Sequence, residues 1–400
     1  MISGSSIFGQ VLSLIDRTEF DKIVRKHGGD YRAKGFRCQD LLGAMLFCQI
    51  GQASSLSEIS CGLNGAGKKL RHLGIKKAPG KSTLSYANAH RPWKIFEELF
   101  YTLHNRLSGQ FRGKKPFRFK AKLFSLDGTV IDLCGSMFDW CHYQRTKGAV
   151  KVHLALDHDG NLPAFACITD AKHSEKAVAK RIPLPSGSIV AIDRGYWDFG
   201  LFRQWTDQGI FFVTRPRGGF SYDILEERDI PSRSNVVFDR VIQSKGQATR
   251  RAGLGKTRLV GVQTDKGVME FLTNNMKLSA QTIGQIYKQR WQIENFFKTL
   301  KQNLRIKHFV GTSANALKIQ IWTALIAVLL LKYLKDRAKL TWSLSNLVAM
   351  LRWNLLKYTD LWEWLDNPGS NPASPPGYTQ GYLPGMGLGQ QRRATVISDS

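Results

Sequence analysis

The segment from Tyr287 to Lys301 contains side chains that could act together on a phosphate ester. At about 100° per residue on a helix, four polar side chains of this segment fall within a window of about 60°: Tyr287, Arg290, Glu294 and Lys301. On such a face Glu294 could bind a metal ion while Arg290 and Lys301 hold phosphates. Arg and Glu four residues apart are also common on solvated helices, where they only form an ion pair. The remainder of the chain has to decide between these two interpretations.

Two aspartates stand in or at the end of apolar segments that resemble β-strands. Asp127 lies within Ser-Leu-Asp-Gly-Thr-Val, and Asp193 ends Val-Ala-Ile-Asp and is followed by Arg-Gly-Tyr. A carboxylate within an apolar strand costs free energy unless it is paired or bound to a metal ion. Either aspartate alone could be a hydrogen-bonded turn residue. A functional role therefore depends on whether the fold brings the two together.

The order of the predicted elements does bring them together. Strands are predicted near 124–133, 150–156, 162–169, 188–193 and 209–214, with helices near 175–180 and 199–208. Three strands followed by alternating helix and strand is the order of a ribonuclease-H-like α/β layer, in which the first and fourth strands are neighbours. Asp127 and Asp193 would then converge, and Glu294 on a later helix would complete the site. Three carboxylates suit Mg²⁺ or Mn²⁺, and two such ions can stabilise both oxygens of a phosphodiester exchange.

The charge of the chain points to a polyanionic partner. Fifty-eight Lys and Arg residues against 31 Asp and Glu residues give a net charge of +27. Residues 1–122 contain 22 basic and 8 acidic side chains, so about half of the excess lies in less than a third of the length. Nucleic acid is the most common partner of such a protein, and an acidic membrane is a less common one.

The chain divides into four predicted parts. Residues 1–118 form a helical, basic DNA-binding domain, and 119–310 form the ribonuclease-H-like catalytic domain, with a β-rich insertion at about 216–273. C-terminal helices follow at 311–366, and the Pro-, Gly- and Ser-rich tail at 367–400 is predicted to be disordered. In the first part, a helix from Ser82, which could cap it, to Arg91 follows a basic turn. This helix could enter a DNA groove or be purely structural.

No membrane segment or disulfide framework is predicted. The apolar stretch Ile319–Leu331 is too short to span a bilayer and is interpreted as a core helix. The six cysteines form no CxxC pair, and we interpret them as buried, reduced thiols. The reduced thiols lead us to expect a cytosolic protein.

Three sequence motifs together resemble one family. They are Asp127-Gly-Thr, Asp193-Arg-Gly-Tyr and Tyr287-x2-Arg290-x3-Glu294-x6-Lys301, and they are similar to those of the bacterial DDE transposases of the insertion sequence 4 family. The segments Ala53-Ser-Ser-Leu-Ser-Glu-Ile and Ser82-Thr-Leu-Ser-x-Ala-Asn also resemble N-terminal segments of that family. The similarity covers about residues 5 to 365.

This resemblance implies a two-metal endonuclease and strand transferase that acts on double-stranded DNA. Such an enzyme binds terminal inverted repeats, nicks transposon ends with water, forms and reopens a hairpin, and joins the end to target DNA. The resemblance implies that Asp127, Asp193 and Glu294 bind Mg²⁺ or Mn²⁺. It further implies that Tyr287, Arg290 and Lys301 contact the DNA near the cut, and that a homodimer holds the two ends in a synaptic complex.

The chain departs from the family pattern in one respect. Some relatives use a tryptophan of the insertion to stabilise a flipped base, but this sequence has no tryptophan between Trp205 and Trp291. Phe220 or Tyr222 could stack in its place. Two alternatives to a transposase also remain: a nuclease that cuts without joining, and a non-catalytic DNA-binding protein derived from a transposase.

Overall fold

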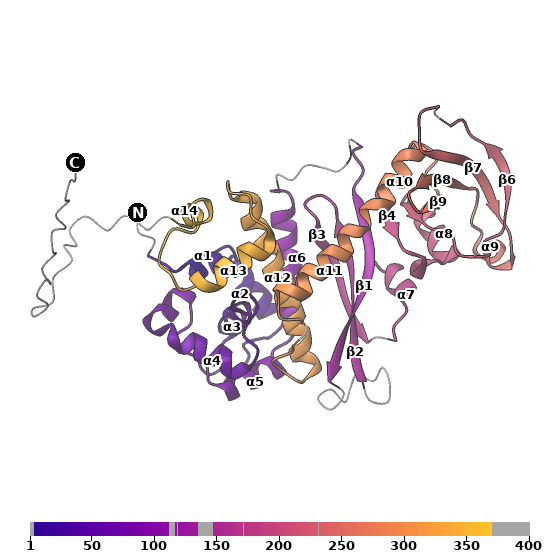
Figure 1. The fold of residues 1–400 in the computed structure, drawn as a ribbon. Helices are drawn as coiled ribbons and strands as arrows, with labels where there is room; N and C mark the ends of the chain where they lie inside the picture. The colour runs from indigo at the N-terminus through magenta and orange to yellow at the C-terminus, as the bar shows by residue number, and fades with distance from the viewer. Residues whose placement is uncertain are drawn as a thin grey trace, which may run out of the picture.

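The computed structural model describes residues 4–111, 117, 119–134, 147–170, 172–230, 232–306 and 308–369. It is a mixed α/β molecule in which a group of helices adjoins one large sheet (Figure 1). Several sequence predictions concern residues outside this part of the chain. They are the tail beyond residue 369, residues 112–116 and 118 of the basic linker, and the thiols of Cys134 and Cys141.

The sheet has nine strands. They are β1 (Leu123–Cys134), β2 (Lys147–Asp157), β3 (Leu162–Asp170), β4 (Ile189–Ile192), β5 (Phe211–Thr214), β6 (Tyr222–Glu227), β7 (Val236–Ser244), β8 (Thr257–Thr264) and β9 (Gly267–Thr273). Their order across the sheet is β3-β2-β1-β4-β5-β9-β8-β7-β6. The first three strands are antiparallel, whereas β4 runs parallel to β1 and β5 parallel to β4. The predicted proximity of the first and fourth strands is confirmed.

Helices cover both faces of the central strands. The apolar residues of β4 are all buried, as is typical of a strand covered on both faces. One face packs against α7 (Glu175–Ala179), the 3-10 turn η3 (Arg194–Tyr196) and α8 (Phe199–Asp207). The other face packs against α10 (Ala280–Gln289), through Ile283 and Ile286.

The β-rich insertion extends the same sheet. β9 pairs with β5, and β8, β7 and β6 follow outward, with α9 (Gln247–Ala252) between β7 and β8. Within the predicted β-rich insertion, the residues from Leu259 to Leu272 form a hairpin of β8 and β9 that turns at Asp265 and Lys266. Buried Arg258 pairs with Asp239 at 2.7 Å and donates to the carbonyls of Asn275 and Leu278. These bonds tie the insertion to the segment that leads into α10.

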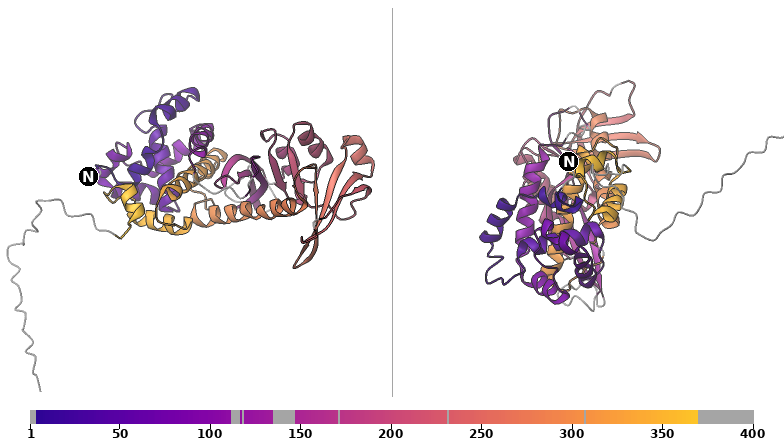
Figure 2. Two further views of the ribbon diagram at one scale, coloured as in Figure 1. Left: turned by 90° about the horizontal axis from the view of Figure 1, so that it is seen from above. Right: turned by 90° about the vertical axis from the view of Figure 1, so that its left-hand side faces the viewer.

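The N-terminal and C-terminal helices form one helical body. The first group comprises α1 (Ile7–Ser13), α2 (Arg17–Lys26), α3 (Cys38–Gly51), α4 (Leu56–Gly65), η1 (Gly67–Leu73), α5 (Lys81–His90) and α6 (Lys94–Ser108). The second comprises α12 (Ala314–Arg337), α13 (Leu344–Asn354) and α14 (Leu361–Asp366). Both groups contribute to a single core, with α12 packed against α3, α5 and α6 (Figures 1 and 2). The predicted parts 1–118 and 311–366 therefore share their interior.

Helix α12 is longer than the predicted core helix. Its 24 residues are long and apolar enough to cross a membrane, but 83% of its most apolar stretch is buried inside the molecule. Buried Gln320 donates to the carbonyls of Arg305 and His308, so its amide is satisfied by protein groups. Helix α12 is therefore buried as a core helix, as predicted for the apolar stretch Ile319–Leu331.

Two local predictions in the helical body are wrong. Helix α5 begins at Lys81 with Gly80 at its N-cap, so Ser82 does not cap it. Cys61 is exposed on α4, whereas Cys38 and Cys48 are buried, and burial raises the pKa of the Cys48 thiol to about 12. The apolar neighbours of Cys61 in the sequence lie on the opposite side of its helix, because neighbouring residues on a helix point in different directions.

Candidate active site

Asp127 and Asp193 lie side by side on two parallel strands. The register of β1 and β4 pairs Leu126 with Ile192, so the two aspartates take the next position on each strand. Side chains alternate between the faces of a sheet, and Leu126 and Ile192 belong to the core on the α8 side. Asp127 therefore points to the face covered by α10, whereas Asp193 directly follows β4 as the N-cap of η3.

Backbone amides hold both carboxylates. Asp127 Oδ1 accepts a hydrogen bond from the Gly128 amide, and Asp193 Oδ1 accepts one from the Gly195 amide, each at 2.8 Å. Burial raises the pKa of Asp127 to about 6, and the negative charge of Asp193 adds to this effect, whereas the Gly128 hydrogen bond and Arg290 oppose it. A buried carboxylate next to a second carboxylate is a favourable place for a cation.

The polar side chains that are predicted to share one helix face, from Tyr287 to Lys301, lie on two successive helices. Arg290 is both the C-cap of α10 and the N-cap of α11 (Trp291–Asn303), and the two helices continue almost in line across the sheet (Figure 2). Arg290 donates to Glu294 Oε1 at 2.6 Å, and its guanidinium lies 5.7 Å from the centre of the Tyr287 ring. Lys301 donates to the Val130 carbonyl of β1 at 3.0 Å. The Lys301 bond fixes α11 against the strand that carries the first aspartate.

Arg290 links the glutamate to the aspartates. Burial lowers the pKa of its guanidinium, but Tyr287, Glu294 and Asp127 outweigh this effect, so that the pKa is raised. Its charge therefore acts on Asp127 and on Glu294 at once. The Nε atom of Arg290 is buried and has no hydrogen-bond partner within the described part of the chain. It is a spare donor on a side chain whose charge acts on Asp127.

The donor chemistry fits a hard cation, although the three predicted ligands do not converge fully. Carboxylate oxygens are the ligands that Mg²⁺ and Mn²⁺ prefer, and Asp127 and Asp193 are placed together. Glu294 is engaged by Arg290. Among the described residues, no three His, Cys, Asp or Glu side chains are close enough to bind one ion. Binding by the triad thus requires Glu294 to leave Arg290.

The sequence pattern does not single out Glu175, a further acidic residue at the site. Glu175, the first residue of α7, has an oxygen 2.6 Å from the position that a Cβ atom on Gly195 would take, and Asp193 Oδ1 is 2.9 Å from the same point. Burial raises the pKa of the Tyr196 phenol well above its ordinary value, and the charges of Glu175, Asp127 and Asp193 raise it further. The negative charges of all three carboxylates therefore act on this phenol. A single glutamate opening a short helix carries no sequence signal for such a role.

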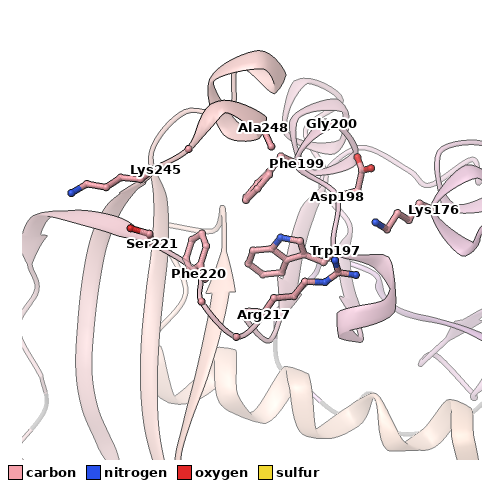
Figure 3. Close-up of a pocket in the computed structure, with 13 residues that line it drawn as sticks. Lys176, Trp197, Asp198, Phe199, Gly200, Arg217, Phe220, Ser221, Lys245 and Ala248 are labelled. Atoms are coloured by element: carbon pink, nitrogen blue, oxygen red, sulfur yellow. The ribbon is translucent and has the colours of Figure 1, made fainter.

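An aromatic hollow adjoins the site. Trp197, Phe199 and Phe220 surround a cavity of about 770 Å³, with Lys176 and Arg217 at its rim (Figure 3). The centre of the Trp197 ring lies 5.2 Å from that of Phe220 and 5.5 Å from that of Phe199. Trp197 lies before the insertion in the sequence, outside the segment in which some relatives have the stacking tryptophan.

Comparison with known families identifies the catalytic part. Residues 118–330 match the family model described as "Transposase DDE domain", over more than half of the chain. The chain belongs to the DDE transposases. Residues 3–76 of this transposase match a second model, described as a domain of unknown function (DUF4372).

Several proteins to which this transposase is similar are themselves named as transposases. It is 29% identical to "Putative transposase y4zB" of Sinorhizobium fredii, over 74% of this chain and 83% of that protein. It is 26% identical to "Probable transposase for insertion sequence element IS5377" of Geobacillus stearothermophilus, over 64% of this chain and 68% of that protein. It is 25% identical to "Transposase InsG for insertion sequence element IS4" of Escherichia coli, over 46% of this chain and 43% of that protein.

One solved structure covers most of the transposase at low similarity. It is the cryo-EM structure of the piggyBac transposase synaptic complex with hairpin DNA, at a TM-score of 0.40 and 12% identity. The match covers 94% of this chain and 86% of that chain.

Proposed function

We propose that this DDE transposase cuts the ends of an insertion sequence and joins them to target DNA. Asp127, Asp193 and Glu294 would bind two Mg²⁺ or Mn²⁺ ions. The observation that carries the proposal is the register of β1 and β4, which brings the two aspartates to neighbouring positions, with the charge of Arg290 acting on Asp127. When bound, the two ions supply Lewis-acid stabilisation of the attacking and leaving oxygens of a phosphodiester.

Arg290 and Glu294 exchange partners in this proposal. Glu294 is bound to Arg290 in the structure, and it turns to the cation site when DNA arrives. The guanidinium of Arg290 then binds a phosphate oxygen of the DNA end, because its planar group presents parallel N–H donors that match the geometry of phosphate. Tyr287 stacks against the same guanidinium and positions it. Lys301 adds a positive charge beside β1, where it also contacts the DNA backbone.

The aromatic hollow provides a place for a base removed from the helical stack. A hairpin at a DNA end strains its terminal bases, and an unpaired base gains free energy by stacking on aromatic rings. Phe220 is one of the two residues, with Tyr222, that could stack in place of a tryptophan, and it lies beside Trp197. Lys176 and Arg217 at the rim would bind the adjacent phosphates. Tyr222 contacts Phe220 at 5.5 Å between ring centres and supports it from behind.

The helical body would bind the terminal inverted repeats. Helix α5 follows the basic 3-10 turn η1 and exposes one polar face, which includes Lys81, Ser85, Tyr86 and His90. The exposed Tyr86 ring stacks on His90 at 4.2 Å between ring centres. A helix with such a face fits a major groove, while the lysines of η1 contact phosphates.

The catalytic domain, the oligomeric state and the cellular location are part of the same proposal. The order β3-β2-β1-β4-β5 supports a ribonuclease-H-like catalytic domain at 119–310, with the insertion attached through β9. Two DNA ends must be held for joining, so the active form would be a homodimer. Its place of action would be the nucleoid of a bacterial cytoplasm.

The decisive test is a DNA cleavage assay. The substrate carries the inverted repeats that flank the coding region, and the products are resolved as nicked, hairpin and joined DNA. Asp127→Ala, Asp193→Ala and Glu294→Ala should each abolish nicking in Mg²⁺ while DNA binding, measured by gel shift, persists. Unchanged nicking in all three variants would overturn the site assignment. Hydrolysis without joining by the native protein would favour the nuclease, and binding without any cleavage would favour a non-catalytic DNA-binding protein.

A further inference from the structure

Glu175 approaches the aspartates from the opposite face of the sheet. It opens α7, between β3 and β4, whereas Glu294 lies on α11 with the α10 side of the sheet. Its Oε2 atom and Asp193 Oδ1 lie 2.6 and 2.9 Å from one point, the Cβ position on Gly195. The two carboxylates are therefore close neighbours, although they come from different layers of the fold.

Two glycines leave the space that Glu175 uses. A Cβ atom on Gly195 would collide with Glu175, and one on Gly128 would lie 3.4 Å from the other oxygen of that carboxylate. Gly128 follows Asp127 directly, and Gly195 follows Asp193 by two residues. Both aspartate segments thus lack a side chain on the side from which Glu175 arrives. At Gly128 the same Cβ atom would lie 2.8 Å from Lys151 Cε, so this space holds the Lys151–Glu175 pair.

A cation and an unsatisfied nitrogen accompany Glu175. Lys151 of β2, with 14% of its side chain exposed, binds Glu175 Oε1 at 2.5 Å. His153 is 1% exposed, and its Nδ1 atom has no hydrogen-bond partner within the described residues. That atom lies 3.3 Å from the Cβ position on Gly128, while its Nε2 atom meets the Thr169 hydroxyl. A water molecule or another polar group in this space would satisfy the nitrogen.

Both glutamates are paired with a basic side chain. Glu294 is paired with Arg290 on one face of the sheet, and Glu175 is paired with Lys151 on the other. In each pair the basic side chain balances the charge of the carboxylate. The side chain of Glu175 is 22% exposed and that of Glu294 is 33% exposed, so both can still exchange partners.

We propose that Glu175 is a fourth acidic ligand of the metal centre and binds an ion together with Asp193 after Lys151 releases it. The inference rests on the proposed metal-dependent function. It explains why Gly128 and Gly195 leave room on the α7 side and why a buried imidazole nitrogen faces that room. The competing explanation is an ion pair that only joins α7 to β2.

The two explanations predict different effects of the two partners. If Glu175 is a ligand, Lys151 competes with the metal ion for the same carboxylate. Glu175→Gln should then weaken metal binding, and Lys151→Met should strengthen it. If the pair is only structural, both variants lose the same contact and change metal binding in the same direction.

The test is Mn²⁺ binding to the full chain without DNA, measured as loss of the free Mn²⁺ signal in electron paramagnetic resonance. Glu175→Gln should raise the dissociation constant about 10- to 100-fold. Lys151→Met should lower it by a few-fold. The matched control is Glu227→Gln, which removes another glutamate paired with a basic residue, Arg240, on the far edge of the sheet, and it should leave binding unchanged.

The Mn²⁺-binding results distinguish a wrong role for Glu175 from a wrong metal centre, on which the inference rests. If Asp193→Asn binds Mn²⁺ as the native chain does, the proposed metal centre itself is wrong. If Asp193→Asn loses Mn²⁺ while Glu175→Gln retains native binding, only the role of Glu175 is wrong. Should Glu175→Gln fail to fold, as judged by circular dichroism, Lys151→Met decides, because weaker or unchanged Mn²⁺ binding in that variant overturns the inference.

Discussion

Replacing Asp127 by asparagine should stabilise the folded chain when divalent ions are removed. The pKa of Asp127 is raised from 3.8 to about 6, chiefly by burial. A difference of about two pKa units corresponds to ~3 kcal/mol of free energy of unfolding that the ionised carboxylate costs at neutral pH. Asparagine carries no charge and keeps an oxygen for the Gly128 amide, so it removes most of this cost. We expect a gain of up to ~3 kcal/mol.

The pH dependence of this gain has a definite sign. Because the folded pKa is raised, the cost is fully present above pH 6, where the folded carboxylate is ionised. As the pH falls from about 6 toward 3.8, the folded chain takes up a proton that the unfolded chain does not bind, and the cost disappears. The advantage of Asp127→Asn should therefore be largest at pH 7 to 8 and shrink steadily toward pH 4.

Urea unfolding followed by circular dichroism, with a chelator present, measures this difference. Asp132→Asn is the control, since Asp132 is exposed on the same strand, and it should change little. Adding Mg²⁺ should then stabilise the native chain and leave Asp127→Asn unaffected, because only a protein that binds the ion gains from it. The reasoning fails if Asp127→Asn is no more stable than the native chain at pH 7.5, or if its advantage does not depend on pH.

Three further substitutions test other contacts. Arg290→Ala should reduce nicking about 10²- to 10³-fold, because the site loses a preorganised hydrogen-bond donor. DNA binding, measured by gel shift, should be retained. Nicking at a near-native rate would contradict the proposed role of Arg290. Gly195→Ala places a Cβ atom 2.6 Å from a carboxylate oxygen, so it should lose Mn²⁺ affinity, whereas Gly218→Ala, with open space around it, should not. Arg258→Met leaves Asp239 buried without its cation and should lower the free energy of unfolding by about 3–5 kcal/mol in urea titrations; a loss below 1 kcal/mol would show that the pair is not needed.

The central site could be anticipated because its signals are local. Apolar strands interrupted by Asp127 and Asp193 can be recognised in the sequence, and the order of elements along the chain then makes the two strands neighbours. The contact between Arg290 and Glu294 follows from their spacing of four residues. The break at Arg290 left no signal, because its backbone remains close to helical on both sides.

Other features depend on contacts between distant segments. Lys151 lies 24 residues before Glu175, and no spacing rule joins a strand residue to the first turn of a later helix. The edge strand β6 reads Tyr-Asp-Ile-Leu-Glu-Glu and is largely exposed, so it lacks the alternation of apolar and polar residues that marks a half-buried strand. Its pairing with β7, rather than its own residues, makes it a strand.

The junction at Arg290 divides the long helical stretch between two cores. Ile283 and Ile286 of α10 belong to the core between the sheet and the insertion, whereas Ile293 and Leu300 of α11 belong to the core of the helical body. The second core also contains Ile131 and Leu133 of β1, and Lys301 bonds to the Val130 carbonyl. Helix α11 is therefore held between the helical body and the strand that carries Asp127. A change in the packing of the helical body would act on Glu294 and on β1 together.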